Sequence, residues 1–206
     1  KGIDKAKVLD IACGEGAFSI EAAIHGANVT AIDAREERMN IGRDIVKNNS
    51  IRNIEFKKED LRMLTFEKNG KFDVVLLLGV LYHLDVPDSF RALENIYEMT
   101  DGLLIIDTHI AMTANESTEY KKKVYKGVKF REHYQSDTDE DKLAKVRASV
   151  DNEFSFWFTK DSLIQLLHDL GFSSVLECHA PIEPLKSENR VTLVALKGRN
   201  RRISTY

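Results

Sequence analysis

Cysteine is scarce in this sequence, because Cys13 and Cys178 are the only two in 206 residues and they lie far apart. Two distant cysteines are typical of a protein from a reducing compartment, and they do not indicate a fold held together by disulfides. Neither sign of charge is in excess, since 30 Lys and Arg residues face 33 Asp and Glu residues, for a formal net charge of -3. Bulk electrostatics therefore do not draw the chain to nucleic acid or to an anionic membrane, and any polyanion contact must be a local patch.

Long apolar runs are missing as well. The longest, residues 74–82, is too short to span a bilayer, and no signal peptide opens the chain. We therefore expect a cytoplasmic protein that does not engage a membrane. The composition, 43% hydrophobic and 31% charged over 206 residues, predicts one domain with a sizeable core and no internal repeat.

The first half of the chain alternates apolar β-branched runs with amphipathic helical stretches. This alternation implies right-handed crossovers and a parallel sheet covered on both faces. Two late strands have no helix of useful length between them and should pair antiparallel. We predict an α/β fold: a Rossmann-like, doubly wound sheet of seven strands, mostly parallel with an antiparallel last strand. The predicted strands are residues 8–11, 29–32, 54–56, 72–78, 103–107, 174–178 and 191–197, and the early helices are residues 16–25, residues 35–47 and a helix beginning near Pro87.

Residues 109–158 interrupt this alternation. They hold a basic segment, residues 121–131, followed by an acidic run, residues 137–141. The charged composition predicts an insertion with some helix, forming a mobile lid over the carboxyl ends of the sheet rather than part of the core. Regular structure resumes with Thr159 as the N-cap of a helix that ends at Gly171.

A glycine-containing turn follows the first predicted strand, where residues 10–16 read DIACGEG. Gly14 and Gly16 allow close backbone approach to a ligand, and the following helix points free N–H groups at it. Asp33 lies 19 residues after Gly14, at the end of the second strand, where a carboxylate can bind both hydroxyls of a ribose. The alternative is a tight turn beside a surface aspartate. The order strand, turn, helix and acid favours a nucleoside-containing cofactor.

The identity of that cofactor depends on a third glycine. A dinucleotide fingerprint needs one three residues after the second, where this chain has Ser19, which counts against NAD and FAD. Residues 8–16 instead resemble the first motif of class I S-adenosylmethionine-dependent methyltransferases. The resemblance covers nearly the whole chain and implies a single methyltransferase domain over residues 1–206 that uses S-adenosyl-L-methionine. It extends through residues 32–33, 59–61 and 72–75 and the closing strand pair.

The resemblance also implies which residues hold the cofactor. The family usually has glycine where this chain has Ala12. An acid after a strand is often a helix cap instead, so Asp60 keeps that second interpretation. The implied contacts are Asp10 and the backbone of Ala12, Gly14 and Gly16 for the methionine part, Asp33 for the ribose, Asp60 and the Leu61 backbone for adenine, and Gly79 beside the sulfonium.

Histidines follow two of the predicted strands. Tyr82 and His83 come after the fourth and His109 after the fifth, at the carboxyl edge where open α/β folds bind ligands. An oxygen or nitrogen acceptor must lose a proton, so His83 and His109 are both candidates for the base, although His83 could equally be a helix-start histidine. The cysteines have no zinc-type spacing, so no metal is expected.

Residues 79–83, which read GVLYH, and the closing strand, residues 190–197, are similar to the bacterial tRNA wobble-uridine carboxymethyltransferase group. In that group a tyrosine matching Tyr82 and an arginine matching Arg190 bind the extra carboxylate of a carboxylated cofactor. A further lysine that binds this carboxylate lies in an N-terminal extension of those enzymes. A guanidinium and a phenol would equally suit an acidic substrate, and Arg190 could also be a strand-edge charge.

The main expectation is a methyltransferase that moves a methyl group in line to an oxygen or nitrogen of a small-molecule acceptor. One alternative is methyl or carboxymethyl transfer to a tRNA wobble uridine, with the basic segment and Arg199, Arg201 and Arg202 as phosphate contacts. Such basic runs are also found on solvated faces. The other alternative is a noncatalytic nucleoside-binding module.

Overall fold

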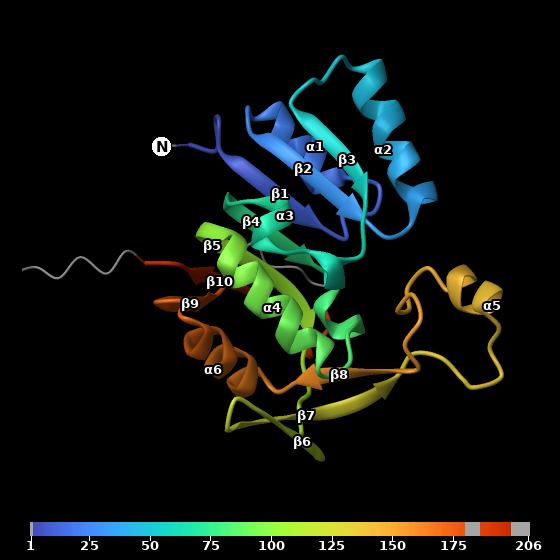
Figure 1. Cartoon of the computed structure of the whole chain (residues 1–206), viewed down its shortest axis with the longest axis vertical. Helices are drawn as coiled ribbons and strands as arrows, with labels where there is room; N and C mark the ends of the chain where they lie inside the picture. Colours follow the sequence, from blue (N-terminus) through green and yellow to red (C-terminus); the bar gives the residue numbers. More distant parts are fainter. Residues whose placement is uncertain (1, 180–185, 199–206) are drawn as a thin grey trace, which may run out of the picture.

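A seven-stranded sheet forms the centre of the computed structural model, which describes residues 2–179 and 186–198 (Figure 1). Its strands are β1 (Lys7–Ile11), β2 (Asn28–Asp33), β3 (Ile54–Lys58), β4 (Phe72–Leu78), β5 (Thr100–His109), β9 (Ser174–Glu177) and β10 (Arg190–Leu196). They lie in the order β3-β2-β1-β4-β5-β10-β9. β10 runs antiparallel to both of its neighbours, β5 and β9, and the other neighbouring pairs in this sheet are parallel. The prediction of a mostly parallel doubly wound sheet with an antiparallel last strand is confirmed.

Helices cover both faces of this sheet. The apolar strand β4 serves both, since Val75 and Leu77 belong to one buried cluster and Leu76 to the other. In Figure 1, α4 and α6 lie in front of the sheet and α1 lies behind it. The helices are α1 (Ala17–Ile24), α2 (Glu36–Asn48), α3 (Phe66–Asn69), α4 (Asp88–Met99) and α6 (Lys160–Leu170), with 3-10 turns η1 (Leu61–Met63) and η2 (Leu81–His83).

The insertion, residues 109–158, differs from its prediction. Beyond β5 it forms a three-stranded antiparallel sheet of β6 (Glu116–Tyr120), β7 (Lys123–Arg131) and β8 (Phe154–Phe158), and only α5 (Asp139–Ala144) is helical. Tyr125, Phe156 and Phe158 are buried in the same cluster as the residues of α4 and α6. The insertion does contain some helix, as expected, but its strands are part of the core, which corrects the expectation that it stays outside the core.

The boundaries of α6 follow the predicted caps. The Thr159 hydroxyl accepts a hydrogen bond from the Ser162 backbone N–H at 3.3 Å, and Gly171 ends the helix with a left-handed φ of 117°. No helix among the described residues is long and apolar enough to cross a membrane.

Candidate active site

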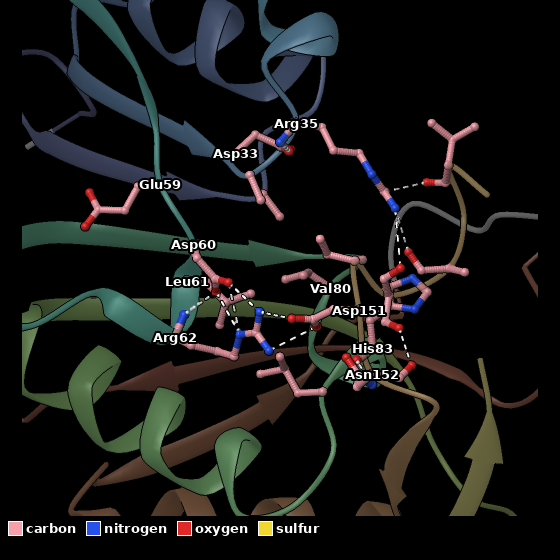
Figure 2. Close-up of a pocket in the computed structure, with 18 of the residues that line it drawn as sticks. Asp33, Arg35, Glu59, Asp60, Leu61, Arg62, Val80, His83, Asp151 and Asn152 are labelled. Atoms are coloured by element: carbon pink, nitrogen blue, oxygen red, sulfur yellow. Dashed lines mark hydrogen bonds and ion pairs between the residues drawn. The ribbon is translucent and has the colours of Figure 1, made fainter. Parts of the chain in front are cut away.

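A cavity lies at the carboxyl ends of β1, β2 and β4 and is covered by a loop of the insertion (Figure 2). This loop, residues 145–152, connects α5 to β8. Six of the predicted site residues line the cavity: Ala12, Asp33, Asp60, Leu61, Gly79 and His83. The other predicted site residues are not among the residues that line it: Asp10, Gly14, Gly16, Tyr82, His109 and Arg190.

The glycine turn owes its shape to left-handed backbone conformations. Gly14 has a φ of 57° and Gly16 a φ of 80°, and a Cβ on Gly16 would lie 2.7 Å from the Phe56 ring. Ala12 has a φ of 59°, a conformation that costs a non-glycine residue about 1–2 kcal/mol. This explains in physical terms why the resembling family favours glycine there. Because Gly16 has no Cβ, the turn can pack directly against the Phe56 ring of β3.

Asp10 is buried and does not line the cavity. It is 2% exposed, and its Oδ2 accepts a hydrogen bond from the Ser19 hydroxyl at 2.5 Å. Burial raises the pKa of Asp10 to about 6, against the opposing effect of the Ser19 hydrogen bond. Ser19 stands where a dinucleotide site has its third glycine, and here its hydroxyl satisfies a buried carboxyl. Contact of Asp10 with the methionine part of a cofactor stays a prediction.

Asp33 has the geometry of a ribose ligand. Its Oδ2 accepts the Gly14 N–H and its Oδ1 accepts the Arg35 N–H, both at 2.8 Å. These two bonds fix the carboxylate at the end of β2. Each carboxylate oxygen has a second lone pair, so the group can still accept from two neighbouring hydroxyls in the cavity. The residues at this end of the cavity therefore fit the ribose of S-adenosylmethionine.

Asp60 both caps a turn and faces the cavity. Its Oδ1 accepts the Arg62 N–H at 2.9 Å, which begins η1, and its Oδ2 accepts from Arg62 Nη2 at 2.6 Å. Burial acts to raise the pKa of Asp60, but the hydrogen bonds from Arg62 outweigh it and the pKa is lowered. The helix-cap interpretation is thus correct, while contact with adenine stays a prediction.

Two arginines that follow β2 and β3 connect the loop of residues 145–152 to the Rossmann-like region. Arg62 donates to both oxygens of Asp151, at 3.0 and 2.8 Å, as the dashed lines in Figure 2 show. The Arg35 guanidinium donates to the backbone carbonyls of Val146 at 3.0 Å and Ala148 at 3.2 Å. We call these contacts the arginine bridges. Sequence reasoning missed both residues, although each stands two positions after a predicted ligand acid.

His83 is held by a buried acid from the insertion. Its Nδ1 lies 2.9 Å from Glu132 Oε1, with 16% of the His83 side chain and 2% of the Glu132 side chain exposed. His83 also lines the cavity beside Gly79. With Nδ1 engaged, Nε2 is the ring nitrogen left for chemistry. Glu132 is a site residue that the sequence analysis did not find.

His109 has a different environment. Its ring stacks on Trp157 at 5.1 Å and meets Tyr82 edge-on at 4.7 Å, and its Nδ1 lies 3.2 Å from Asn189 Oδ1. Trp157 in turn donates its Nε1–H to the Tyr82 carbonyl at 2.9 Å. This aromatic packing lies outside the cavity lining, so the two histidines are distinguished by position.

Tyr82 and Arg190 converge near Gly79. A Cβ on Gly79 would lie 3.5 Å from Arg190 Nη2 and 3.9 Å from the Tyr82 hydroxyl. Arg190 Nε donates to Asp107 Oδ1 at 2.6 Å, so the guanidinium already has a carboxylate partner. Burial raises the pKa of Tyr82, which keeps it a neutral phenol.

Several residues of the basic segment are neutralised by acids of the same chain. Lys121 pairs with Glu94, Lys123 with Asp169 and Arg131 with Glu153. Arg199, Arg201 and Arg202 lie outside the described residues. Across residues 2–179 and 186–198, no three His, Cys, Asp or Glu side chains are grouped as metal ligands would be.

Comparison with known sequences shows that residues 8–101, in the first half of the chain, match a family model described as a methyltransferase domain. The ubiquinone biosynthesis O-methyltransferase of Acinetobacter baumannii is 34% identical over 88 residues, which are 43% of this chain and 37% of that protein. The putative methyltransferase YqeM of Bacillus subtilis is 34% identical over 111 residues, 52% of this chain and 43% of that protein. The chain thus matches less than half the length of these relatives.

Comparison with solved structures extends the likeness through the insertion. The N-terminal domain of EvdMO1, solved in the presence of SAH and D-fucose, has a TM-score of 0.75 at 20% identity over 94% of this chain and 76% of that one. Magnesium protoporphyrin IX methyltransferase (ChlM) from Synechocystis PCC 6803 with bound SAM has a TM-score of 0.61 at 19% identity, over 96% of this chain and 72% of that one. At this identity the likeness shows the fold.

Proposed function

We propose that this chain transfers a methyl group from S-adenosyl-L-methionine to an oxygen or nitrogen of a small-molecule acceptor. The match of residues 8–101 to a methyltransferase domain and the Rossmann-like fold shared with S-adenosylmethionine-dependent methyltransferases support this proposal. One observation carries the proposal. Asp33, Asp60 and His83 line one cavity, so the acids proposed to bind the nucleoside and the proposed base share one space.

The strand ends hold the cofactor in this proposal. Asp33 takes the ribose hydroxyls, Asp60 and the Leu61 backbone take adenine, and Gly79 leaves space for the sulfonium. Asp10, Gly14 and Gly16 then act mainly from behind, because they shape the turn that carries Ala12. When bound, the cofactor supplies an activated methyl group whose leaving sulfur needs no protonation.

Catalysis then consists mainly of placement and one proton transfer. The cavity holds the acceptor in line with the methyl group at attack distance, and the covering loop keeps water out. His83 takes the acceptor proton on Nε2. His109 is the weaker candidate, because it packs among aromatic rings beside the cavity instead of lining it.

The acceptor is proposed to be a small molecule because the names of the relatives include ubiquinone biosynthesis and magnesium protoporphyrin IX. Transfer to tRNA has less support, since Lys121, Lys123 and Arg131 are paired with acids of the chain. The ordinary donor is favoured over the carboxylated one for a related reason: Arg190 already binds Asp107.

Calorimetric titration with S-adenosylhomocysteine (SAH), the demethylated cofactor, tests the proposal. Asp33→Ala removes the proposed ribose ligand and should weaken SAH binding by about 1.5–3 kcal/mol, or roughly 10- to 150-fold. Asp44→Ala, on the exposed side of α2, is the matched control and should bind like the wild type. Tight binding of NADH with no response to SAH would overturn the cofactor assignment.

Methyl transfer itself is tested with radiolabelled S-adenosylmethionine and fractionated cell extract as the source of acceptors. Label in a small-molecule fraction is the expected result. Label in the tRNA fraction would promote the nucleic-acid alternative, and SAH binding without transfer to any fraction would favour a noncatalytic module.

A further inference from the structure

We propose that Glu132 is a positioning residue, which holds His83 in the one neutral tautomer whose Nε2 can accept a proton from the acceptor. The inference rests on the proposed function, in which His83 is the base. It assigns to the insertion a part in the chemistry as well as in covering the cavity.

The hydrogen bonds of Glu132 determine the tautomer. Oε1 accepts from the Ser155 hydroxyl at 2.9 Å, and Oε2 accepts from the Ser149 N–H at 3.0 Å. Burial acts to raise the pKa of Glu132, but the hydrogen bond and charge of His83, helped by these two donors, outweigh it and lower the pKa. Glu132 is therefore ionised near neutral pH. An ionised carboxylate only accepts hydrogen bonds, so the hydrogen in its contact with His83 belongs to Nδ1.

A neutral imidazole carries one proton, so fixing it on Nδ1 leaves Nε2 with a free lone pair. In the proposed step the acceptor O–H or N–H bond breaks and its proton moves to Nε2. The acceptor forms a bond to the methyl carbon, and the carbon–sulfur bond breaks with its electron pair going to sulfur. His83 leaves the step as an imidazolium paired with the Glu132 carboxylate, and then returns the proton to water.

The same contacts connect the base to the covering loop. Ser149 and Asn152 both line the cavity. The Ser149 N–H binds Glu132, and the Asn152 side-chain amide donates to the His83 carbonyl at 3.0 Å. The covering loop therefore supplies one hydrogen bond to each member of the His83–Glu132 pair.

Nitrogen NMR of protein labelled with ¹⁵N-histidine tests the inference without a known acceptor. The chain has six histidines, and the spectrum of His83→Ala identifies the His83 signals. In mildly alkaline buffer with SAH bound, we expect a protonated Nδ1 and an unprotonated Nε2. Glu132→Leu should give a mixture of tautomers, and Glu132→Gln should restore much of the preference, because its amide oxygen still accepts. Glu153→Gln, which alters the pair with Arg131, is the control and should leave the His83 signals unchanged.

The inference is overturned if wild-type His83 carries its proton on Nε2, or if Glu132→Leu keeps the wild-type tautomer. Should Glu132→Leu not fold, the wild-type spectrum and Glu132→Gln decide between these outcomes. SAH titration of each variant separates this test from the proposed function, because loss of SAH binding by the wild type would reject the function whatever the tautomer. With an acceptor in hand, Glu132→Leu should lower kcat at least about tenfold while SAH affinity stays within about twofold.

Discussion

Each of the two regions that enclose the cavity contains a buried carboxyl group whose pKa is shifted, Asp10 in one and Glu132 in the other, and the two shifts have opposite signs. In the Rossmann-like region, burial raises the pKa of Asp10 to about 6. The Ser19 hydroxyl is the one side-chain donor that lowers this pKa, and its effect is smaller than that of burial. In the insertion, burial is outweighed at Glu132 by an imidazole, a hydroxyl and a backbone N–H, and the pKa is lowered. The number and charge of the donors, and not burial alone, decide which buried acid stays ionised.

The two regions also differ in how they are held. Residues 7–109 form most of one continuous sheet, so each strand is fixed by its neighbours. The insertion is attached at two levels. Its strands β7 and β8 share the main core, whereas its covering loop is held by polar contacts, among them the arginine bridges from Arg35 and Arg62. Only the second level is built from partly exposed polar contacts, and these open at lower cost.

Glycine substitutions should give the largest effect and test whether the insertion strands belong to the core. A Cβ on Gly16 would meet the Phe56 ring at 2.7 Å, and one on Gly127 would meet the Trp157 carbonyl at 2.3 Å. Both Gly16→Ala and Gly127→Ala should lower the free energy of unfolding, by about 2–5 kcal/mol in the first, where φ strain adds, and about 1–3 kcal/mol in the second. Urea unfolding followed by circular dichroism measures both.

Gly70→Ala is the control for that comparison. Gly70 has a φ of 78° and a ψ of -154°, a backbone conformation open mainly to glycine, but nothing lies within 4 Å of the added methyl group, so only the conformational cost of about 1–3 kcal/mol remains. If Gly127→Ala left the main unfolding transition unchanged, the insertion strands would be an independent lid and the two-level description would be wrong.

The Rossmann-like region was largely predictable because its signals are local. A run of apolar residues marks β4, glycines mark the turn before α1, and Asp33 stands at a strand end. The antiparallel pairing of β10 with β9 also followed from the short connection between them. Each of these features depends on neighbours in the sequence, so one chain is enough to detect it.

The insertion was predictable only in its position. Its charged composition suggested an exposed lid, yet β7 places Tyr125 in the core while the lysines of the strand and Arg131 stay exposed. The site contacts it supplies join residues far apart in sequence, 49 positions between His83 and Glu132 and 89 between Arg62 and Asp151. No local pattern marks such pairs, because they are formed by tertiary packing.

The two buried acids should give opposite responses to pH, an effect of intermediate size. The ordinary pKa of 3.8 applies to Asp10 in the unfolded chain. The contribution of Asp10 to the wild-type free energy of unfolding therefore falls as pH rises from about 4 through 6, by at most about 3 kcal/mol. Asp10→Asn should therefore gain stability over the wild type across that window. Glu132 contributes stability above its ordinary pKa of 4.5, and this is lost as pH falls through its lowered folded pKa.

Accordingly, Glu132→Gln should be most destabilised, relative to the wild type, above about pH 4.5, and the difference should shrink in acid. Urea unfolding of the three proteins from pH 3 to pH 7 measures both trends. The difference in free energy of unfolding between each variant and the wild type should change with pH in opposite directions for Asp10→Asn and Glu132→Gln. Changes of the same sign and slope would show that burial dominates at both sites.

The smallest effect is expected at the arginine bridges. Arg62→Leu removes the contact with Asp151, a partly exposed pair that contributes about 1 kcal/mol or less, so amide exchange in residues 145–152 should rise by at most about fivefold. Exchange in β7 and β8 should not change, because the core holds those strands, and SAH should slow exchange in the loop of the wild type. Arg91→Leu, which alters an exposed pair with Asp88 on α4, is the matched control. If loop and strands speed up together, the insertion opens as one unit, and if SAH leaves strong protection of the loop unchanged, the loop does not act as a lid.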